Sequence, residues 1–440
     1  MTDLLQYPIR RHGASGIARS IEDAVRAGRV APGSLLPTVR GLAGRLRVSP
    51  ATVAAAYRIL AGRGLVSGQG RRGTRVSPRP PVRTPASAPL PAGLRDLASG
   101  NPDVRLLPAL PLRAVDVRPR LYGGDRVRPE LLEAGRRLLA ADGVLTESLT
   151  VVGGALDGLE RVLQAQLRPG DRVAVEDPGY TGVLDLVSGL GLVPEAVPLD
   201  DSGPLPDGLD AALRRGAHAF VVTPRAQNPT GAALDARRAR ALGAILDRHP
   251  DILLFEDDHA GSVAGAPLHT LAHRRRPRWA VARSVSKALG PDLRLALLAG
   301  DATTIARVEG RQHVGSGWVS HVLQQLVVAL LGDEHTEARL AEAARTYAAR
   351  RDALLEALGR HGIAAHGRSG LNVWVPVPEE QAVVAGLAAA GWAVRAGERY
   401  RLRTPPGIRI TTATLKAEDA RRVATDLAAT LRGATQTRSA

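Results

Sequence analysis

A proline-rich stretch divides this chain of 440 residues into a short N-terminal part and a long C-terminal part. Six prolines fall between Ser77 and Pro91. Proline fixes one backbone dihedral and has no main-chain N–H to donate, so such a stretch is extended and semi-rigid. We therefore expect two folding units, with a first domain over residues 1–76, a linker over residues 77–95 and a second domain over residues 96–440.

The net positive charge of the chain, +16 at pH 7, is concentrated before this linker. The first 90 residues carry fifteen arginines and three acidic residues, a formal charge of +12, and the rest carries +4. A short, strongly basic unit beside a nearly neutral large one favours a nucleic-acid-binding module. Charge alone leaves open the alternative of an arginine-rich, solvated surface.

The apolar spacing before the linker predicts three helices followed by two short strands. Ser49 and Pro50 form a typical N-terminus for the third helix. Three helices and a two-stranded wing are the outline of a winged helix-turn-helix. The expected elements are helices over residues 15–29, 39–46 and 50–60 and strands over residues 64–66 and 74–76.

This pattern resembles the winged-helix domain of GntR-type bacterial regulators, from Pro32-Gly33 through the third helix to the wing Gly70-Arg71-Arg72-Gly73-Thr74. The resemblance implies that the third helix enters the major groove of double-stranded DNA, while arginines contact phosphates. Pro50 stands where these domains often carry a basic residue. A winged helix used only for protein contacts is the alternative. The residues expected to contact DNA are Arg40, Ser49, Thr52, Arg58, Arg71 and Arg72.

After the linker, strand-like and helical runs alternate, which predicts an α/β domain with a largely parallel sheet. A long helical stretch over Ser320–Leu358 precedes a final α+β segment. The expected strands cover residues 172–176, 219–223, 252–256, 280–283, 295–299, 371–375 and 407–411, and the expected helices include residues 154–166, 235–248 and 305–311.

Only two of the 59 basic residues are lysines, Lys287 and Lys416. A guanidinium stays protonated and cannot replace a primary amine in imine chemistry. A lysine retained in such a chain therefore points to a chemical role. Lys287 is the candidate because it closes Ser284-Val285-Ser286-Lys287, whereas Lys416 stands at a polar helix start.

Three further features accompany Lys287: Asn228-Pro229-Thr230-Gly231, Glu256-Asp257-Asp258-His259 and, after the lysine, Arg294. In this order and spacing they resemble fold-type I aminotransferases, which use pyridoxal 5'-phosphate (PLP). The resemblance implies PLP as the cofactor and no metal. The expected fold class is a winged helix-turn-helix plus an α/β PLP-dependent transferase of fold type I, with a mainly parallel sheet and a small C-terminal α+β subdomain.

The resemblance also assigns roles. Lys287 would form an imine with the cofactor, and Asp257 would pair with the pyridine nitrogen, with Glu256 as the less favoured choice. Asn228 would donate to the ring's phenolic oxygen. The phosphate would be held by Ser284, Ser286, Arg294 and the main chain of Gly154 and Ala155, where a helix begins.

More peripheral positions match the same family. Tyr180 would cover one face of the cofactor, and Tyr122 would reach the phosphate of the second subunit in a dimer. Arg409 would bind a substrate or effector carboxylate. A packed tyrosine and a surface arginine are the plain alternatives for Tyr180 and Arg409. Ser99-Gly100-Asn101-Pro102 resembles the segment that enters the active site.

His259 stands where related proteins usually carry a tyrosine that bonds the phenolic oxygen of the cofactor. An imidazole can make that hydrogen bond, but it is a titratable group. This departure weighs against efficient transamination more than against PLP binding.

A GntR-like winged helix joined to an aminotransferase-like domain is the architecture of MocR/PdxR-type transcriptional regulators. The resemblance implies a homodimer that senses PLP, binds a double-stranded DNA operator and controls genes of vitamin B6 or of amino-acid and amine metabolism, with an amino acid or amine as a candidate effector. Catalysis would not be its main task. Two alternatives remain: a working PLP-dependent aminotransferase with an appended DNA-binding domain, and a PLP-free DNA-binding protein whose large domain only dimerises.

The sequence has no cysteine and no run of eighteen or more apolar residues, and residues 1–11 lack an apolar leader. We therefore expect no disulfide, no transmembrane helix, no signal peptide and a cytoplasmic location.

Overall fold

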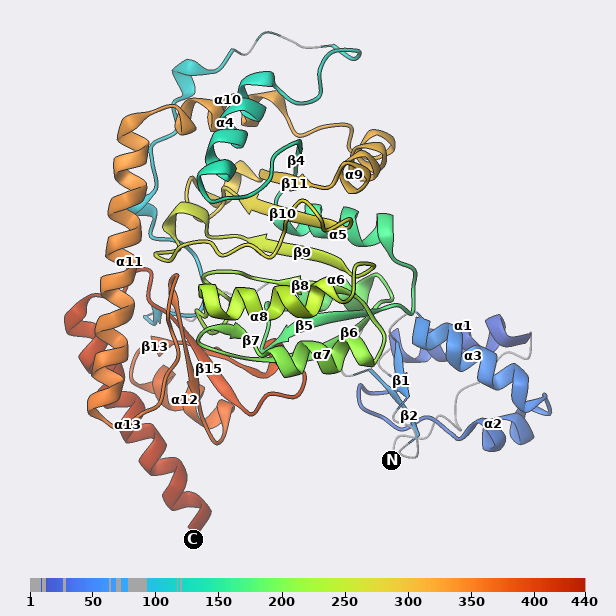
Figure 1. The fold of residues 1–440 in the computed structure, drawn as a ribbon. Coiled ribbons are helices and arrows are strands. Elements are labelled where there is room, and N and C mark those ends of the chain that lie inside the picture. The colour runs from blue at the N-terminus through green and yellow to red at the C-terminus, as the bar shows by residue number, and fades with distance from the viewer. Residues whose placement is uncertain are drawn as a thin grey trace. The chain divides into compact units, whose positions relative to one another are not determined.

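The structure, a computed structural model, describes residue 9 and residues 13–26, 29–62, 65–68, 73–77, 93–116, 118 and 121–439. These residues form an N-terminal module and a larger body (Figure 1).

The N-terminal module is the winged helix-turn-helix that the sequence predicts. Its apolar side chains form one core that draws on all three helices and both strands, with Ile17, Leu42, Val53 and Val76 among its buried members. The strands pair in antiparallel fashion, and the main chain around Leu36 continues the pairing by donating to the Thr74 carbonyl at 2.8 Å. The elements are α1 (Gly13–Arg26), α2 (Val39–Leu46), α3 (Pro50–Gly62), β1 (Val66–Gly68) and β2 (Thr74–Val76).

The body is built on an eight-stranded sheet with the order β4-β11-β10-β9-β8-β5-β6-β7. The central strands are buried almost throughout, as expected for a sheet covered on both faces. Their bounds are β4 (Ser148–Val152), β5 (Arg172–Asp177), β6 (Val193–Asp200), β7 (Gly203–Pro204), β8 (Ala217–Val222), β9 (Leu253–Asp258), β10 (Trp279–Ser284) and β11 (Ala296–Gly300).

The strand directions are mixed at the edges of this sheet. β8, β9 and β10 run parallel to one another, whereas β11 is antiparallel to both β10 and β4, and β7 is antiparallel to β6. The predicted parallel sheet is therefore confirmed for its centre. Parallel neighbours place their carboxyl ends at one edge, where ligand sites of α/β sheets lie.

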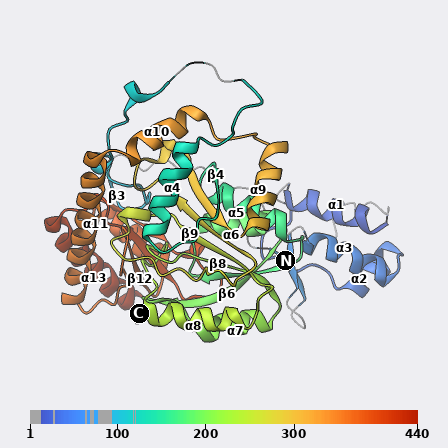
Figure 2. The same ribbon diagram turned by 45° about the horizontal axis from the view of Figure 1, so that its top comes forward.

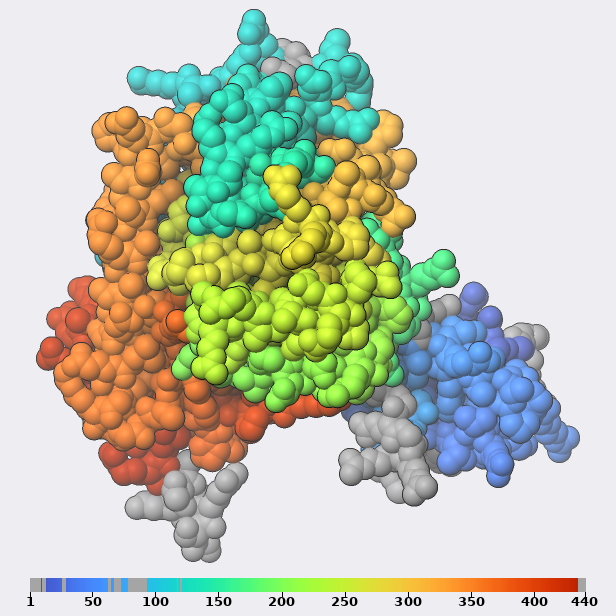
Figure 3. Space-filling view, in the orientation of Figure 1, coloured from blue at the N-terminus to red at the C-terminus, as the bar shows by residue number. Residues whose placement is uncertain are grey.

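Helices pack on this sheet and extend beyond it. α5 contacts β4, β9, β10 and β11, and α7 lies beside α8 next to β8 (Figures 1 and 2). Residues of α7 and α8 form a continuous surface on the side shown in Figure 3. The helices are α4 (Pro129–Ala141), α5 (Ala155–Gln166), α6 (Thr181–Gly189), α7 (Pro206–Arg214), α8 (Ala236–Asp247), α9 (Ala302–Val314) and α10 (His321–Leu331), with short 3-10 turns at Val104–Leu106, Leu112–Ala114, Gly261–Val263, Pro291–Leu293 and Glu398–Tyr400.

The end of the chain forms the expected small α+β subdomain. A three-stranded sheet of order β12-β15-β14 and the parallel pair β13-β3 share an apolar core with Leu97, Leu354 and Leu427. α11 runs along one side of the body from α10 to α13 (Figure 1). The elements are β3 (Arg95–Asp96), α11 (Glu334–Arg360), β12 (Asn372–Pro376), α12 (Glu380–Ala389), β13 (Trp392–Ala393), β14 (Arg395–Ala396), β15 (Gly407–Thr411) and α13 (Ala417–Ser439).

Arg95, the last residue of the expected linker, is also the first residue of β3. The long stretch over Ser320–Leu358 is two helices, because α10 ends at Leu331 and the Asp333 side chain caps a new helix by accepting from the Thr336 main chain at 3.0 Å. Among the described residues, the structure contains no helix long and apolar enough to cross a membrane.

Candidate functional site

The carboxyl end of β9 carries three consecutive acids whose side chains alternate between the two faces of the sheet. Glu256 and Asp258 share one face and Asp257 points to the other, since successive side chains of a strand point in opposite directions. All three are almost completely buried. The alternation separates structural carboxylates from one that is available to a ligand.

Asp258 is held by two buried arginines. Its Oδ1 accepts from Arg225 Nε at 3.0 Å, and its Oδ2 accepts from Arg283 Nε. Both guanidinium groups also donate to Asp142 Oδ2, at 2.9 Å and 2.7 Å. Burial alone would raise the pKa of Asp258, but the two guanidinium groups outweigh it and hold that pKa below its usual value. A buried carboxylate that is doubly paired in this way stays ionised and fixes the end of β9.

Glu256 is also satisfied within the protein. Its Oε2 accepts from the Thr270 hydroxyl at 2.9 Å, and its Oε1 accepts from the Leu271 main chain at 2.5 Å. Burial nevertheless raises the pKa of Glu256 to about 7. With both oxygens occupied on the face opposite Asp257, Glu256 is not free to bind a ligand.

Asp257 differs from its neighbours because its Oδ1 is buried and lacks a hydrogen-bond partner among the described residues. Burial, followed by the negative charge of Asp258, raises the pKa of Asp257 to about 7. An unpaired buried carboxylate is costly unless a ligand supplies the missing donor. Asp257 is therefore the acid that a cationic or protonated ligand group would satisfy.

Lys287 lies in the loop after β10 and is partly buried. Its Nζ donates to the Gly100 carbonyl at 2.7 Å. Burial, followed by the positive charge of Arg409, lowers the pKa of Lys287 to about 8. A lysine whose amine loses its proton near neutral pH is a competent nucleophile toward a carbonyl.

Arg409 on β15 is 3% exposed, so it is not the surface arginine of the plain alternative. Its Nη1 donates to Asn228 Oδ1 at 3.1 Å, its Nη2 donates to the Ala98 carbonyl, and its guanidinium lies 5.2 Å from the centre of the Tyr400 ring. Its Nε has no partner among the described residues. The structure thus brings Arg409, Asn228 and Lys287 together.

His259 has one of its two ring nitrogens occupied. Nε2 lies 2.8 Å from the Ala226 carbonyl oxygen, which can only accept, so Nε2 carries the proton in this bond. Burial, followed by the charge of Lys287, lowers the pKa of His259 to about 4. The ring is therefore neutral above that pH, and Nδ1 can only accept a hydrogen bond, whereas a tyrosine hydroxyl could donate one.

The residues expected around the phosphate lie at the ends of adjacent elements. Gly154 precedes α5 with a φ of +110°, and a side chain there would meet Arg294 Nη2 at 3.3 Å. The first turn of α5, from Ala155, presents main-chain N–H groups without partners inside the helix. The Ser284 hydroxyl lies 3.1 Å from the Ser286 hydroxyl, directly before Lys287.

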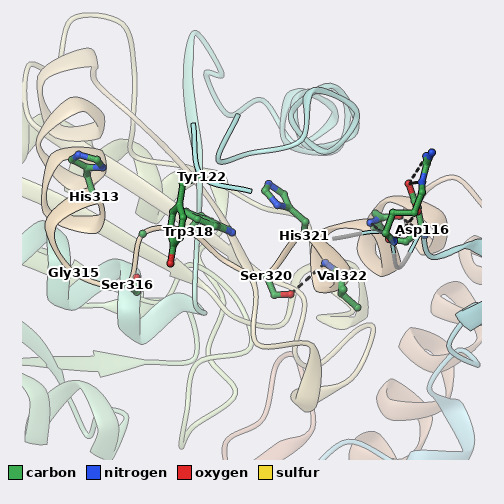
Figure 4. A pocket seen from close by; sticks show the side chains of 12 residues that line it. Asp116, Tyr122, His313, Gly315, Ser316, Trp318, Ser320, His321 and Val322 are labelled. Atoms are coloured by element: carbon green, nitrogen blue, oxygen red, sulfur yellow. Dashed lines mark hydrogen bonds and ion pairs between the residues drawn. The ribbon is translucent and has the colours of Figure 1, made fainter. Parts of the chain in front are cut away.

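The two predicted tyrosines lie in different settings. Tyr180 is half-buried, and burial raises the pKa of its phenol, on which the charges of Asp257, Arg409 and Arg294 also act. Tyr122 is 90% exposed, and its ring packs edge-on against Trp318 at 5.5 Å. Figure 4 shows Tyr122, Trp318 and His321 along an open pocket of about 730 Å³.

In the N-terminal module, Arg40 and Arg58 are exposed, as a DNA contact requires. Ser49 caps α3 by accepting from the Thr52 main chain at 3.1 Å, and the two hydroxyls lie 2.8 Å apart. Ser49 therefore has a structural role in addition to the expected one, and it holds Thr52 at the exposed start of the helix. Arg71 and Arg72 lie outside the described residues.

Several groups at the site carry no strong signal in the sequence. The Ala98 and Gly100 carbonyls are main-chain atoms, although the motif at residues 99–102 marks their neighbourhood. Glu176 at the end of β5 accepts from the Thr223 main chain at 3.1 Å, and burial raises its pKa to about 7. Its position at the end of an apolar strand is the one cue that could have found it.

Replacing Asp257 by asparagine should change the pH dependence of folding in the PLP-free protein. The folded chain keeps a proton on Asp257 up to about pH 7, whereas the unfolded chain releases it near 3.8. The contribution of Asp257 to the unfolding free energy therefore falls as the pH rises from about 4 to about 7, by up to about 1.4 kcal/mol per unit of pKa shift.

The variant lacks this titration. Its unfolding free energy relative to the unchanged protein is expected to rise over the same window, as measured by denaturant unfolding at several pH values. Asp200→Asn is the control: although partial burial acts the other way, hydrogen bonds from Arg238 and Ser202 lower the pKa of Asp200 and keep its titration below this window. A flat difference for Asp257→Asn would contradict the raised pKa.

Comparison with protein families gives two matches that follow one another along the chain. Residues 14–76 match the family of bacterial regulatory proteins of the gntR type. Residues 96–427 match the family of class I and II aminotransferases.

Individual regulators match most of the chain. The chain is 41% identical over 419 residues to the vitamin B6 salvage pathway transcriptional repressor PtsJ of Salmonella typhimurium, covering 94% of this chain and 97% of that protein. It is 29% identical to the pyridoxine biosynthesis transcriptional regulator PdxR of Corynebacterium glutamicum, covering 78% of each chain.

Solved structures of aminotransferases resemble the greater part of this chain. An archaeal alanine:glyoxylate aminotransferase has a TM-score of 0.69 at 23% identity and covers 77% of this chain and 91% of its own. A kynurenine aminotransferase from Pyrococcus horikoshii has a TM-score of 0.70 at 21% identity and covers 78% of this chain and 92% of its own. The fold of the body is that of fold-type I aminotransferases.

Proposed function

Because this chain belongs to the class I and II aminotransferase family and carries a GntR-family domain ahead of that region, we propose that it is a MocR/PdxR-type transcriptional regulator that binds PLP and operator DNA. The observation that carries the proposal is the presence of two groups in one site. One is the partly buried amine of Lys287, and the other is the buried carboxylate of Asp257, whose Oδ1 has no hydrogen-bond partner among the described residues. This pair belongs to a chain whose N-terminus is a winged helix.

The residues of the body fit PLP. When bound, PLP supplies an aldehyde that reacts with a lysine amine and a pyridine ring that withdraws electrons when its nitrogen is protonated. Lys287 provides an amine whose pKa is lowered to about 8. Asp257 Oδ1 would accept the hydrogen bond of a protonated ring nitrogen and so lose its unpaired state. Asp257 rather than Glu256 takes this role, because Glu256 has both oxygens occupied.

The remaining residues orient the ligand. Arg294, the serines at 284 and 286 and the first N–H groups of α5 would bind the phosphate through charge-assisted hydrogen bonds. Tyr180 would cover one face of the ring. Arg409 would offer its Nε, unpartnered within the described part of the chain, to the carboxylate of an amino-acid effector. His259 would donate a hydrogen bond from Nε2 to the Ala226 carbonyl, and its unprotonated Nδ1 would accept one from the ligand.

The N-terminal module would bind double-stranded DNA with α3 in the major groove. Exposed Arg58 on this helix and Arg40 on α2 supply positive charge, and the sequence adds more at Arg71-Arg72. We propose that two copies of the chain pair as a cytoplasmic homodimer. Exposed Tyr122 and its partner Trp318 would then belong to the subunit interface, beside the phosphate of the other copy.

The regulated genes are proposed from the relatives. Two of them are described as regulators of vitamin B6 salvage and of pyridoxine biosynthesis. A regulator that binds the end product of such a pathway closes a feedback loop. We propose that this chain controls genes of vitamin B6 metabolism in response to PLP.

The proposal is tested by footprinting full-length protein on the DNA upstream of its own gene, with and without PLP. PLP loading is followed in parallel by the visible absorption of the bound cofactor. The expected result is a coloured protein whose footprint changes with PLP. A colourless protein with an unchanged footprint would instead support the PLP-free scaffold. Repeated conversion of L-amino acids by the PLP-loaded protein, with an unchanged footprint, would support the aminotransferase.

A further inference from the structure

The first segment of the body after the linker, Arg95–Asn101, runs from the C-terminal subdomain to the lysine site. We call it the strap. At its start, β3 pairs with β13, and Arg95 forms an ion pair with Asp419 of α13 while its guanidinium lies 5.5 Å from the centre of the Trp392 ring. Figure 2 labels β3 in this region of the body. The strap is thus anchored at the residue where the linker ends.

The middle of the strap is a tight turn held by one side chain. Asp96 Oδ1 accepts from the main-chain N–H groups of Ala98 at 2.8 Å and Ser99 at 2.9 Å. Leu97 is buried in the subdomain core, and its N–H donates to the Ala393 carbonyl at 2.9 Å. These contacts fix the orientation of the Ala98 and Gly100 carbonyls toward the site.

Two strap carbonyls accept hydrogen bonds from cationic side chains of the site. The Gly100 carbonyl accepts from Lys287 Nζ at 2.7 Å, and the Ala98 carbonyl accepts from Arg409. Gly100 has a φ of +72°, and a side chain there would meet the Arg409 guanidinium nitrogens at 3.2 Å and 3.3 Å. A larger residue at this position would strain the backbone and crowd the Arg409 guanidinium.

We propose that the strap reports the state of Lys287 to the linker, with the Gly100 carbonyl as the sensing atom and Asp96 as the residue that positions it. The proposal rests on PLP binding at Lys287. It adds a physical route from the ligand site to the segment that leads to the DNA-binding module.

The chemistry of the lysine supplies the switch. A free ammonium group carries three N–H donors, one of which binds Gly100. Condensation of this group with the aldehyde of PLP would release the aldehyde oxygen as water, together with two hydrogens from the nitrogen. At most one N–H would then remain where the ammonium had three, so the hydrogen bond to the Gly100 carbonyl would be weakened or lost.

Thermodynamic linkage couples this change to the conformation of the strap. If the free amine of Lys287 stabilises the conformation in which the strap is bound to the site, and the PLP-bound lysine does not, PLP shifts the equilibrium toward a conformation in which the strap is released from the site. The strap begins with the pairing of Arg95 and Trp392, and the linker enters the body immediately before it. Release of the strap would therefore act on Arg95, which pairs with Trp392 and Asp419 at the start of the body.

Hydrogen exchange of the full-length protein tests the proposal directly. The main-chain N–H groups of residues 97–99 are the reporters, read by mass spectrometry with and without PLP. PLP is expected to accelerate their exchange about tenfold, the change expected when one charge-assisted hydrogen bond is lost. In Lys287→Ala the same amides should exchange rapidly without PLP and should not respond to it.

The outcomes separate this proposal from the proposed function. If PLP colours the protein and residues 97–99 exchange as before, the strap is not a sensor and PLP binding stands. If PLP does not bind, both proposals fail.

Substitution of the positioning residue gives an independent test. Asp96→Ala removes the turn contacts and should retain PLP absorption while losing most of the PLP effect on binding to the upstream DNA. Asp200→Ala is the matched control, because Asp200 Oδ1 holds the Ser202 N–H at 2.8 Å in a turn away from the lysine. An Asp96→Ala protein with an unchanged PLP effect on DNA binding would overturn the proposal.

Discussion

Replacing Lys287 by alanine is expected to abolish covalent PLP binding completely. Lys287 is one of two lysines in the chain, its amine is partly buried, and its pKa is lowered to about 8. No arginine can take its place, because a guanidinium does not deprotonate in this range. The measurement is reduction of PLP-loaded protein with borohydride, followed by peptide mass analysis. The unchanged protein should carry the label on Lys287, and the variant should carry none.

Lys416→Ala is the matched control for that experiment. The side chain of Lys416 is 63% exposed, and its Nζ lies 3.7 Å from Glu418 Oε1. Lys416 is therefore solvated, directly before α13. This variant should label and absorb like the unchanged protein. Labelling of Lys416 in the Lys287→Ala protein would contradict the assignment.

Replacing Arg40 or Arg58 by alanine is expected to weaken DNA binding strongly while leaving PLP absorption intact. Both side chains are exposed on the basic N-terminal module. Loss of a phosphate contact should reduce the slope of log affinity against log salt by about 1, and loss of a base contact should cost about 1–3 kcal/mol. The measurement is fluorescence anisotropy with the upstream duplex over a range of salt concentrations.

Arg137→Ala provides the control for charge alone. Arg137 lies on α4 of the body, is 66% exposed on its side chain and pairs with Glu133. Its replacement by alanine removes the same charge as the other two substitutions and leaves the winged helix unchanged. Equal losses of affinity in all three variants would show that only net charge matters and would contradict a specific role for α2 and α3.

The architecture was largely predictable because its signals are local. Helix starts at Ser49-Pro50 and at Asp235 follow from capping residues, and the apolar runs of β8, β9 and β10 follow from burial. The direction of β11 was not predictable, because antiparallel pairing with β10 and β4 depends on the path of the connecting segments. The break after Leu331 was missed because Gly332 and Asp333 interrupt a continuous apolar pattern only briefly.

The site was predictable in its chemistry and less so in its contacts. A strand ending in three acids indicates a polar edge, but the alternation of faces decides that Asp257 is the one whose oxygen lacks a partner among the described residues. The tautomer of His259 could not be inferred from the sequence, because it depends on a hydrogen bond to the carbonyl of Ala226, which is 33 residues away along the chain. The contacts of the strap carbonyls could not be predicted either, because every residue has a main-chain carbonyl whatever its side chain.

The central claim, that PLP regulates DNA binding, is tested most directly by a closed thermodynamic cycle. PLP affinity is measured with and without the upstream duplex, and duplex affinity is measured with and without PLP. The account predicts that each ligand changes the affinity of the other by the same factor, in the range of about 5- to 150-fold that is typical of allosteric coupling. A factor of one in both directions, together with repeated turnover of an amino acid, would contradict it and identify the chain as an aminotransferase.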